Sequence, residues 1–221
     1  MDFLFNFQAW CRKPAAPPRT VLVAMAEAQA RRAARQAVAR ALSANVIEVD
    51  GRSGFHHAVT FREIDLIVAD ADIKGCRSFE IIEQIRYGRL HGHPFPVVIL
   101  LCDRADSACR QRALDCGADL VLPAGLSARL LAEQVERLAQ DRKPFLVAPH
   151  YIGPERRKAG RAEEDSTSHL VVPNPLARRD GGDEEYRRQL SLASHRLSLM
   201  RRGLYQLRLQ TAAVAVSRGL I

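Results

Sequence analysis

The stretch DLIVAD, residues 65–70, is a short apolar run that ends on a carboxylate. An apolar run of this length, bounded by polar residues, is typical of a strand that is buried on both faces of a sheet. Similar runs lie on either side of it, separated by amphipathic segments. We predict strands at 20–24, 45–50, 65–69, 96–101 and 119–123, and helices at 27–42, 53–62, 78–88, 105–116 and 127–140. This alternation indicates an α/β domain with helices on both faces of a parallel sheet, and functional groups at the carboxyl ends of its strands.

The segments outside this domain differ from it in amino-acid composition. Residues 1–19 form an aromatic N-terminal segment and a proline-rich spacer, which we expect to pack on the domain or a partner, with membrane-surface anchoring as the alternative. The domain itself covers 20–142. Residues 143–182 are rich in Pro, Gly, Arg and Asp and are predicted to be a linker. Residues 183–218 are predicted to form an amphipathic helix, because Asp183 can cap its N-terminus.

Composition limits the kinds of partner and the compartment. The chain has 221 residues and a formal net charge of +8, which favours an acidic partner: nucleic acid, an anionic membrane surface or an acidic protein face. Its five cysteines form no CxxC pair, so we expect neither a disulfide framework nor a zinc finger, and no bound metal or cofactor. No apolar run reaches the roughly 18 residues of a membrane span. We therefore expect a cytoplasmic protein.

Four motifs in the right order resemble the receiver domain of bacterial response regulators, the CheY-like family. They are VLVAMAEAQARR (21–32), DLIVAD with DIKG and FEIIEQIR (65–86), PVVILLC (96–102) and GADLVLPAGLS (117–127). The resemblance covers about residues 20–140. It implies a flavodoxin-like parallel sheet of five strands in the order 2-1-3-4-5, and a role in two-component or phosphorelay signalling.

The resemblance also implies where phosphorylation chemistry would lie. In the family, an acidic pair and an acceptor aspartate hold Mg²⁺, while a hydroxyl residue and a lysine contact the phosphoryl group. The acceptor falls on Asp70, the acidic pair on Met25 and Ala26, the hydroxyl on Leu101 and the lysine on Ala124. Only the acceptor keeps the chemistry, because none of the four other side chains can bind Mg²⁺ or a phosphoryl oxygen. The family also has an aromatic switch residue on the fifth strand, and this position falls on Val121.

These replacements favour a degenerate receiver, a pseudo-receiver that is not an enzyme and acts by protein–protein interaction. Asp70 is then a phospho-acceptor position without activity, with a structural role in capping the following turn or in binding backbone amides. The alternative is a phosphorylatable regulator with an atypical metal site, in which Glu27 and Asp72 replace the lost acids.

The segment PHYIGPERRK, residues 149–158, resembles a Tyr-x-Gly-Pro-acid-Arg-Arg sequence found after receiver domains of alphaproteobacterial regulators. Arg156, Arg157 and Lys158 form a compact basic patch within it. One hypothesis is that the segment folds back on the domain. The other is that the patch contacts a partner or a phosphate.

The last predicted helix carries a heptad seam, which is the period of a coiled coil. The seam consists of Tyr186, Leu190, Ala193, Leu197, Met200, Leu204 and Leu207, and arginines flank it at 187, 188, 196, 201, 202 and 208. We expect Leu190, Leu197, Met200, Leu204 and Leu207 to make an interaction surface. Three uses stay open: a homodimer, docking on the domain or on another protein's helices, and a basic helix that binds DNA or a membrane surface.

Overall fold

The structure is a computed structural model of the chain, and it describes residues 18–74, 76–90, 92–103, 106–156, 168–178 and 183–217. The predicted aromatic segment and nearly all of the spacer, residues 1–17, lie outside the described residues. None of the described helices is long and apolar enough to cross a membrane.

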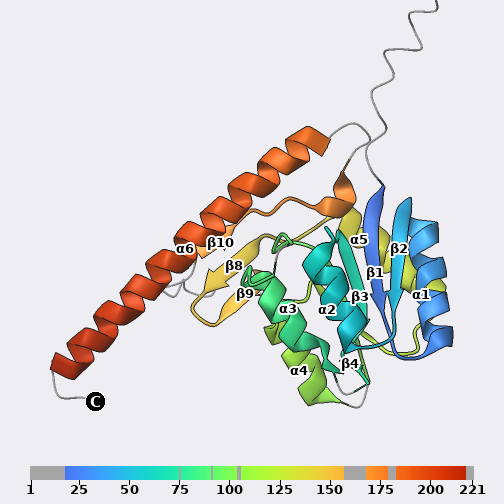
Figure 1. Ribbon diagram of the computed structural model, residues 1–221, viewed down its shortest axis with the longest axis horizontal. Helices are drawn as coiled ribbons and strands as arrows, with labels where there is room; N and C mark the ends of the chain where they lie inside the picture. Colours follow the sequence, from blue (N-terminus) through green and yellow to red (C-terminus); the bar gives the residue numbers. More distant parts are fainter. Residues whose placement is uncertain are drawn as a thin grey trace, which may run out of the picture.

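In the described part of the chain, five parallel strands form the main sheet (Figure 1). They are β1 (Arg19–Ala24), β2 (Ala44–Val49), β3 (Leu66–Asp70), β6 (Val97–Cys102) and β7 (Leu120–Pro123). Their order across the sheet is β2-β1-β3-β6-β7. This order confirms the predicted flavodoxin-like topology, because β6 and β7 are the fourth and fifth strands of the parallel sheet.

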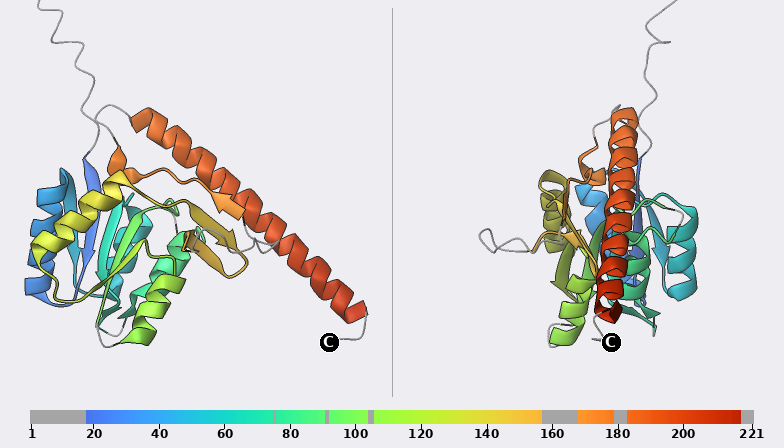
Figure 2. Two further views of the ribbon diagram at one scale, coloured as in Figure 1. Left: turned by 180° about the vertical axis from the view of Figure 1, so that it is seen from behind. Right: turned by 90° about the vertical axis from the view of Figure 1, so that its left-hand side faces the viewer.

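Five helices cover the two faces of this sheet, within the described ranges. They are α1 (Ala28–Ala41), α2 (Arg52–Phe61), α3 (Ser78–Arg86), α4 (Ser107–Asp115) and α5 (Ala128–Gln140). One core cluster joins the strands to α2, α3 and α4, and a second joins them to α1 and α5. In the right-hand view of Figure 2, α2 (cyan) and α5 (yellow) lie on opposite sides of the sheet. Alternate residues of β3 enter the two clusters, Ile67 in the first and Val68 in the second, which explains its continuous apolar run.

A short hairpin between β3 and α3 was not predicted. It pairs β4 (Asp72–Ile73) with β5 (Cys76–Arg77), and Lys74 in its turn has a φ of 50°. The Lys74 ammonium lies 2.9 Å from Asp50, which follows β2. The hairpin therefore packs over the same edge of the sheet as Asp70.

The prediction of a linker over residues 143–182 was wrong for the described parts of that range. They contain β8 (Phe145–Ala148), β9 (Tyr151–Pro154), β10 (Ser168–Leu170) and the 3-10 turn Pro175–Ala177. The strands form an antiparallel sheet in the order β10-β8-β9. Each has only three or four residues, so no alternation of apolar and polar residues is long enough to indicate a strand.

The long helix α6 (Asp183–Ser217) packs on this small sheet, and its N-terminal half lies along the domain (Figures 1 and 2). Its seam residues Tyr186, Ala193 and Leu197 are buried. A third core cluster holds Ala193 and Leu197 together with Phe95, Phe145, Val147, Ile152 and Leu170, and Leu190, Met200 and Leu204 pack against it. The structure thus places the seam on the chain's own body, the second of the three predicted uses. The side chain of Leu207 lies outside the described residues.

A buried carboxylate joins the small sheet to the main one. Asp119, at the start of β7, accepts from Arg86 of α3 at 2.9 Å and from Arg142 at 2.9 Å. All three side chains are at most 2% exposed. Both guanidinium groups lie 5.0 Å from the ring centroid of Phe145 in β8. Other N–H groups of the two arginines donate to backbone carbonyls, namely those of Pro94, Phe95, Pro96, Gly117 and Pro173. Burial lowers the pKa of Arg86 to about 10, which still leaves it charged at neutral pH.

The strand β9 approaches the main domain so closely that two glycines are required. A Cβ at Gly117, whose φ is +88°, would lie 2.3 Å from the carbonyl oxygen of Ile152. A Cβ at Gly153 would lie 2.6 Å from the Cα of Gly117. The glycine of the Tyr-Ile-Gly-Pro sequence is therefore a packing residue, which explains why this segment folds back.

Residues 171–178, which follow β10, cover the amino-terminal edge of the main sheet. Asn174 donates from its side-chain amide to the carbonyl of Leu138 at 2.7 Å and so caps the last turn of α5. Leu176 enters the core cluster below α1 and α5. Arg178 pairs with Asp65 at 2.9 Å, next to the start of β3. These contacts fix the place where α6 begins.

Replacing the shared carboxylate should strongly destabilise the whole molecule. In Asp119→Ala the two buried guanidinium groups lose their counter-ion, and breaking a buried ion pair in this way costs about 3–5 kcal/mol. The free energy of unfolding, measured by urea denaturation, should fall by that amount. The matched control is Glu133→Ala, which removes the exposed Arg129–Glu133 pair and should cost less than about 1 kcal/mol. Equal losses in the two variants would contradict the role given to Asp119.

Candidate functional site

The candidate site is the carboxyl edge of the main sheet around Asp70. Asp70 is the last residue of β3 and pairs in register with Leu101 of β6. Met25 and Ala26 follow β1 directly, and Ala124 follows β7. The parallel topology therefore brings the predicted acceptor and its replaced partners to one edge, as the resemblance implied.

Among the described residues, one hydrogen bond reaches the Asp70 carboxylate. Its Oδ2 accepts from the backbone N–H of Ala26 at 3.3 Å. Burial raises the pKa of Asp70, the Ala26 N–H opposes this, and the negative charge of Glu27 raises it further. No cation contributes to this pKa shift among the described groups. The electrostatic environment of Asp70 thus disfavours added negative charge.

The residues present do not fit the Mg²⁺ ion of the family. Met25 is 1% exposed and Leu101 is 7% exposed, and both belong to the apolar cluster below α1 and α5. Glu27 and Ala124 are exposed. Within the described residues, no group of three Asp, Glu, His or Cys side chains is placed to hold a metal ion. Mg²⁺ needs oxygen ligands in octahedral geometry, and here one carboxylate faces a thioether and two alkyl groups.

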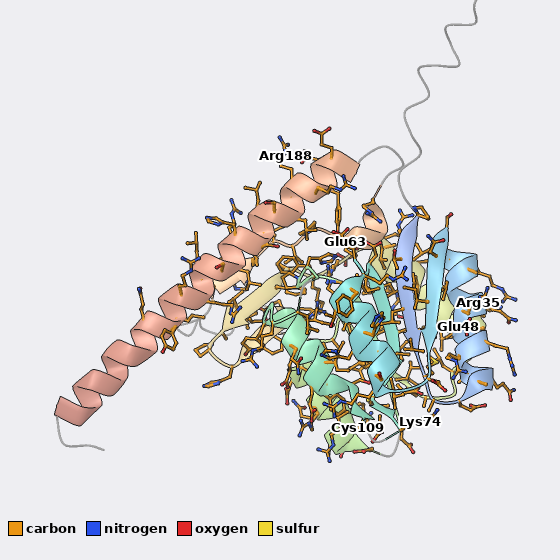
Figure 3. The ribbon with its side chains drawn as sticks, in the orientation of Figure 1. Arg35, Glu48, Glu63, Lys74, Cys109 and Arg188 are labelled. Atoms are coloured by element: carbon orange, nitrogen blue, oxygen red, sulfur yellow. The ribbon has the colours of Figure 1, made fainter. Side chains whose placement is uncertain are left out.

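An arginine that the sequence did not single out fixes the β1–α1 loop. The Arg31 guanidinium donates to the carbonyl of Met25 at 2.7 Å and to that of Ala26 at 3.1 Å. It also lies 3.9 Å from Glu48 of β2, and Arg35, one turn later, pairs with Glu48 at 3.0 Å (Figure 3). In an Ala- and Arg-rich helix nothing in the sequence distinguishes Arg31 from its neighbours. The loop that would carry the metal-binding acids is therefore held by a cation.

The β3–α3 connection is fixed as well. The hydroxyl of Ser78 donates to the carbonyl of Asp70 at 2.6 Å, and Ser78 is fully buried. The N–H of Ala71 donates to the carbonyl of Leu101 at 2.9 Å. Lys74, the cation of the adjacent hairpin, pairs with Asp50 and does not contribute to the pKa of Asp70. These contacts fix the backbone around Asp70, whereas the described hydrogen bond of its carboxylate is to Ala26 in the β1–α1 loop and not to the turn after β3.

A cavity of about 320 Å³ opens beside this edge between α1 and α5. Its lining is mostly alkyl, with Met25, Leu101 and Leu131 at its floor and Glu27 at its rim. Among the described lining residues none is a cation, and Gln29 is the only side chain that could donate to a phosphoryl oxygen. The region next to the acceptor has the chemistry of a small apolar pocket and not of an anion site.

The predicted basic patch is only partly described. Arg156 donates to the carbonyl of Ala118 and lies 3.4 Å from the hydroxyl of Tyr151, so its guanidinium is held against the domain. The hydroxyl of Tyr151 itself donates to the carbonyl of Pro154 at 2.9 Å. Arg157 and Lys158 lie outside the described residues. In the described part the segment therefore folds back, which was the first of its two predicted roles.

Comparisons of the sequence with known families give no match. No family model matches the chain. No curated protein matches it either.

Comparisons of the structure find receiver domains. The response regulator DrrB, a Thermotoga maritima OmpR/PhoB homolog, matches with a TM-score of 0.50 and 16% identity over 58% of this chain and 56% of that chain. The receiver domain of NarL from Mycobacterium tuberculosis has a TM-score of 0.49 and 20% identity, covering 57% of this chain and 100% of its own. The chemotaxis regulator CheY4 of Vibrio cholerae has a TM-score of 0.47 and 19% identity over 55% and 98%.

At these identities the comparisons establish the fold alone. The DrrB match agrees with the strand order β2-β1-β3-β6-β7 and with the helices on both faces. The small sheet and α6 make up most of the remainder of the described chain. The main domain of this protein therefore has the CheY-like fold of a response-regulator receiver.

Proposed function

We propose that this chain is a degenerate receiver of a bacterial two-component or phosphorelay pathway, without enzymatic activity, that acts by binding other proteins. One observation carries the proposal: in the described structure the Asp70 carboxylate accepts a single hydrogen bond, from a backbone N–H. In addition, burial and, to a smaller extent, the charge of Glu27 raise its pKa. Neither feature suits a residue that must accept a phosphoryl group.

The energetics of phosphorylation support this function. A phosphoryl group adds about two negative charges at neutral pH. In the receiver family a metal ion and a lysine offset them, and a metal ion stabilises such charge by several kcal/mol. Here the phosphoryl group would meet Glu27 and the apolar side chains of Met25 and Leu101 instead. Ordinary Mg²⁺-dependent transfer to Asp70 therefore lacks its main source of stabilisation.

We expect such a domain to present one constant docking surface, which phosphorylation does not switch. A switch needs a hydroxyl at the position of Leu101 and an aromatic ring at that of Val121. It also needs mobile loops, whereas Arg31 and Ser78 bind the backbone of the β1–α1 loop and of Asp70. A receiver surface held in one conformation suits an adaptor that presents the same docking face at all times.

The two alternative functions have weaker support. An atypical metal site would need Glu27 and Asp72 near Asp70, yet both are exposed, and no group of metal-binding side chains forms in the described residues. A DNA-binding role would rest on the arginines of α6. Binding through exposed arginines alone is electrostatic, blind to sequence and weakened steeply by salt.

Phosphorylation of the natural chain should fail under conditions that suffice for active receivers. After incubation with acetyl phosphate and millimolar Mg²⁺, intact-protein mass spectrometry should show no added phosphoryl group on the natural chain. NMR signals of the Ala26, Asp70 and Ala71 amides should not shift with Mg²⁺. A matched gain-of-function variant, M25D/A26D, restores the acidic pair and should show Mg²⁺-dependent shifts. Stoichiometric labelling of Asp70 in the natural chain would overturn the proposal.

Neutralising the acceptor position should stabilise the protein slightly at neutral pH. Because the pKa of Asp70 is raised in the folded state, its ionised form is disfavoured there. This penalty is complete above the folded pKa, declines as the pH falls from the folded to the unfolded pKa, and vanishes below the unfolded value. Asp70→Asn can still accept from Ala26. Its free energy of unfolding at pH 7 should exceed that of the natural chain by on the order of 0.5 kcal/mol.

The pH dependence provides the control for this effect. Below the unfolded value of 3.8, the carboxyl of the natural chain is neutral in both states, and the two proteins should have equal stability. A loss of more than about 1 kcal/mol in Asp70→Asn at pH 7 would mean that the ionised carboxylate makes strong stabilising contacts. That result would argue against the vestigial role.

A further inference from the structure

An arginine-lined groove lies at the junction of α3, the β8–β9 turn and α6. Its volume is about 700 Å³, within the range of ligand-binding pockets. Tyr87 and Arg89 border it at the end of α3, and His150 borders it in the turn. From α6 come Arg201, Arg202 and Tyr205, among others. The groove exists only because the small sheet and α6 pack on the receiver domain (Figures 1 and 2).

The cations of the groove are held in fixed positions. The guanidinium groups of Arg89 and Arg201 lie 5.3 Å and 5.5 Å from the ring centroid of Tyr87. Arg201 also donates to the carbonyl of Tyr87. Arg202 donates to the hydroxyl of Ser198 at 3.2 Å. Cations stacked on an aromatic ring lose less side-chain entropy when an anion binds, because their positions are already restricted.

The arginines of this groove have no carboxylate among its described lining residues, although Glu83, one turn earlier in α3, acts on Tyr87 from outside the lining. Across the described chain, no carboxylate forms an ion pair with Arg89, Arg201 or Arg202, in contrast to Arg86, Arg142 and Arg178. The net charge of +8 adds a long-range field of the same sign. An anionic group entering the groove would meet three guanidinium groups.

We propose that this groove binds an acidic peptide segment of a partner protein, which deepens the protein-binding function proposed above and rests on it. The groove follows α6 from Ser198 to Gln206, a length of ~12 Å at 1.5 Å per residue, which suits an extended segment. Arginine forks bind carboxylates in pairs of parallel hydrogen bonds. Tyr205 is 64% exposed, and Leu204 lies beside it, so an apolar residue between the acids has a contact surface.

The groove is remote from the acceptor position. The helix α3 begins at Ser78, which binds the carbonyl of Asp70, and ends next to Tyr87 in the groove. From Ser78 to Tyr87 the axis of α3 rises by ~13 Å at 1.5 Å per residue, so the groove and the turn after Asp70 lie at opposite ends of this helix. Binding in the groove therefore needs no phosphorylation signal, which agrees with a receiver held in one conformation.

The test uses a fluorescein-labelled synthetic peptide of Glu-Glu-Leu repeats, titrated with the full-length chain and followed by fluorescence anisotropy. The groove variant is R89E/R202E. The matched control is R32E/R52E, on exposed positions of α1 and α2, which changes the net charge by the same amount. The groove variant should bind at least about tenfold more weakly, and the control should stay within about twofold of the natural chain. Circular dichroism checks folding, and the single variant Arg202→Gln, at an exposed position, serves if the double variant unfolds.

Each remaining outcome contradicts the proposal. Equal weakening in both double variants would mean binding by net charge alone, and absence of saturable binding by the natural chain would mean that there is no acidic-peptide site. Displacement of the peptide by duplex DNA at about 150 mM salt, lost in R89E/R202E, would assign the groove to nucleic acid instead. The phosphotransfer assay is independent: labelling of Asp70 would overturn the adaptor function and leave the peptide result standing.

Discussion

The architecture depends on one buried carboxylate that two arginines share. Asp119 neutralises half of the charge of Arg86 and Arg142, and backbone carbonyls together with the ring of Phe145 satisfy the remainder. Arg86 belongs to α3 and Arg142 follows α5, so the interaction draws two helices and β8 toward the start of β7. Because β8 lies at the centre of the small sheet, this cluster also positions the surface on which α6 packs.

The carboxyl edge of the main sheet and the junction with α6 differ in their chemistry. At the carboxyl edge of the main sheet, Met25 and Leu101 are buried, and Arg31 donates to the backbone of the adjoining β1–α1 loop. At the junction with α6, guanidinium groups face solvent without a carboxylate partner among the described residues. The described surroundings of Asp70 are therefore largely apolar, while the surface where α6 packs on the domain is cationic.

The main sheet could be predicted from the sequence because the spacing of apolar residues and the segment length differ between its strands and its helices. The small sheet could not, since strands of three or four residues between prolines and glycines give no period, and their burial depends on α6, far away in the sequence. Asp119 was visible only as part of a Gly-Ala-Asp turn. In a chain with 33 Lys and Arg, the buried Arg86 and Arg142 look like surface residues. The position of Asp70 followed from the family resemblance, whereas the contacts of Arg31 and the groove beside Tyr87 arise from tertiary packing alone.

In the described residues, Asp70 lacks the side chains that would bind Mg²⁺ or a phosphoryl group beside it. Anomalous diffraction can measure whether a metal ion nevertheless binds there. Crystals of the full-length chain soaked in Mn²⁺ with beryllofluoride, a phosphoryl analogue, should show no manganese peak and no beryllofluoride density at Asp70. A manganese ion bound to that carboxylate, with Glu27 or other side chains completing its coordination, would contradict the account.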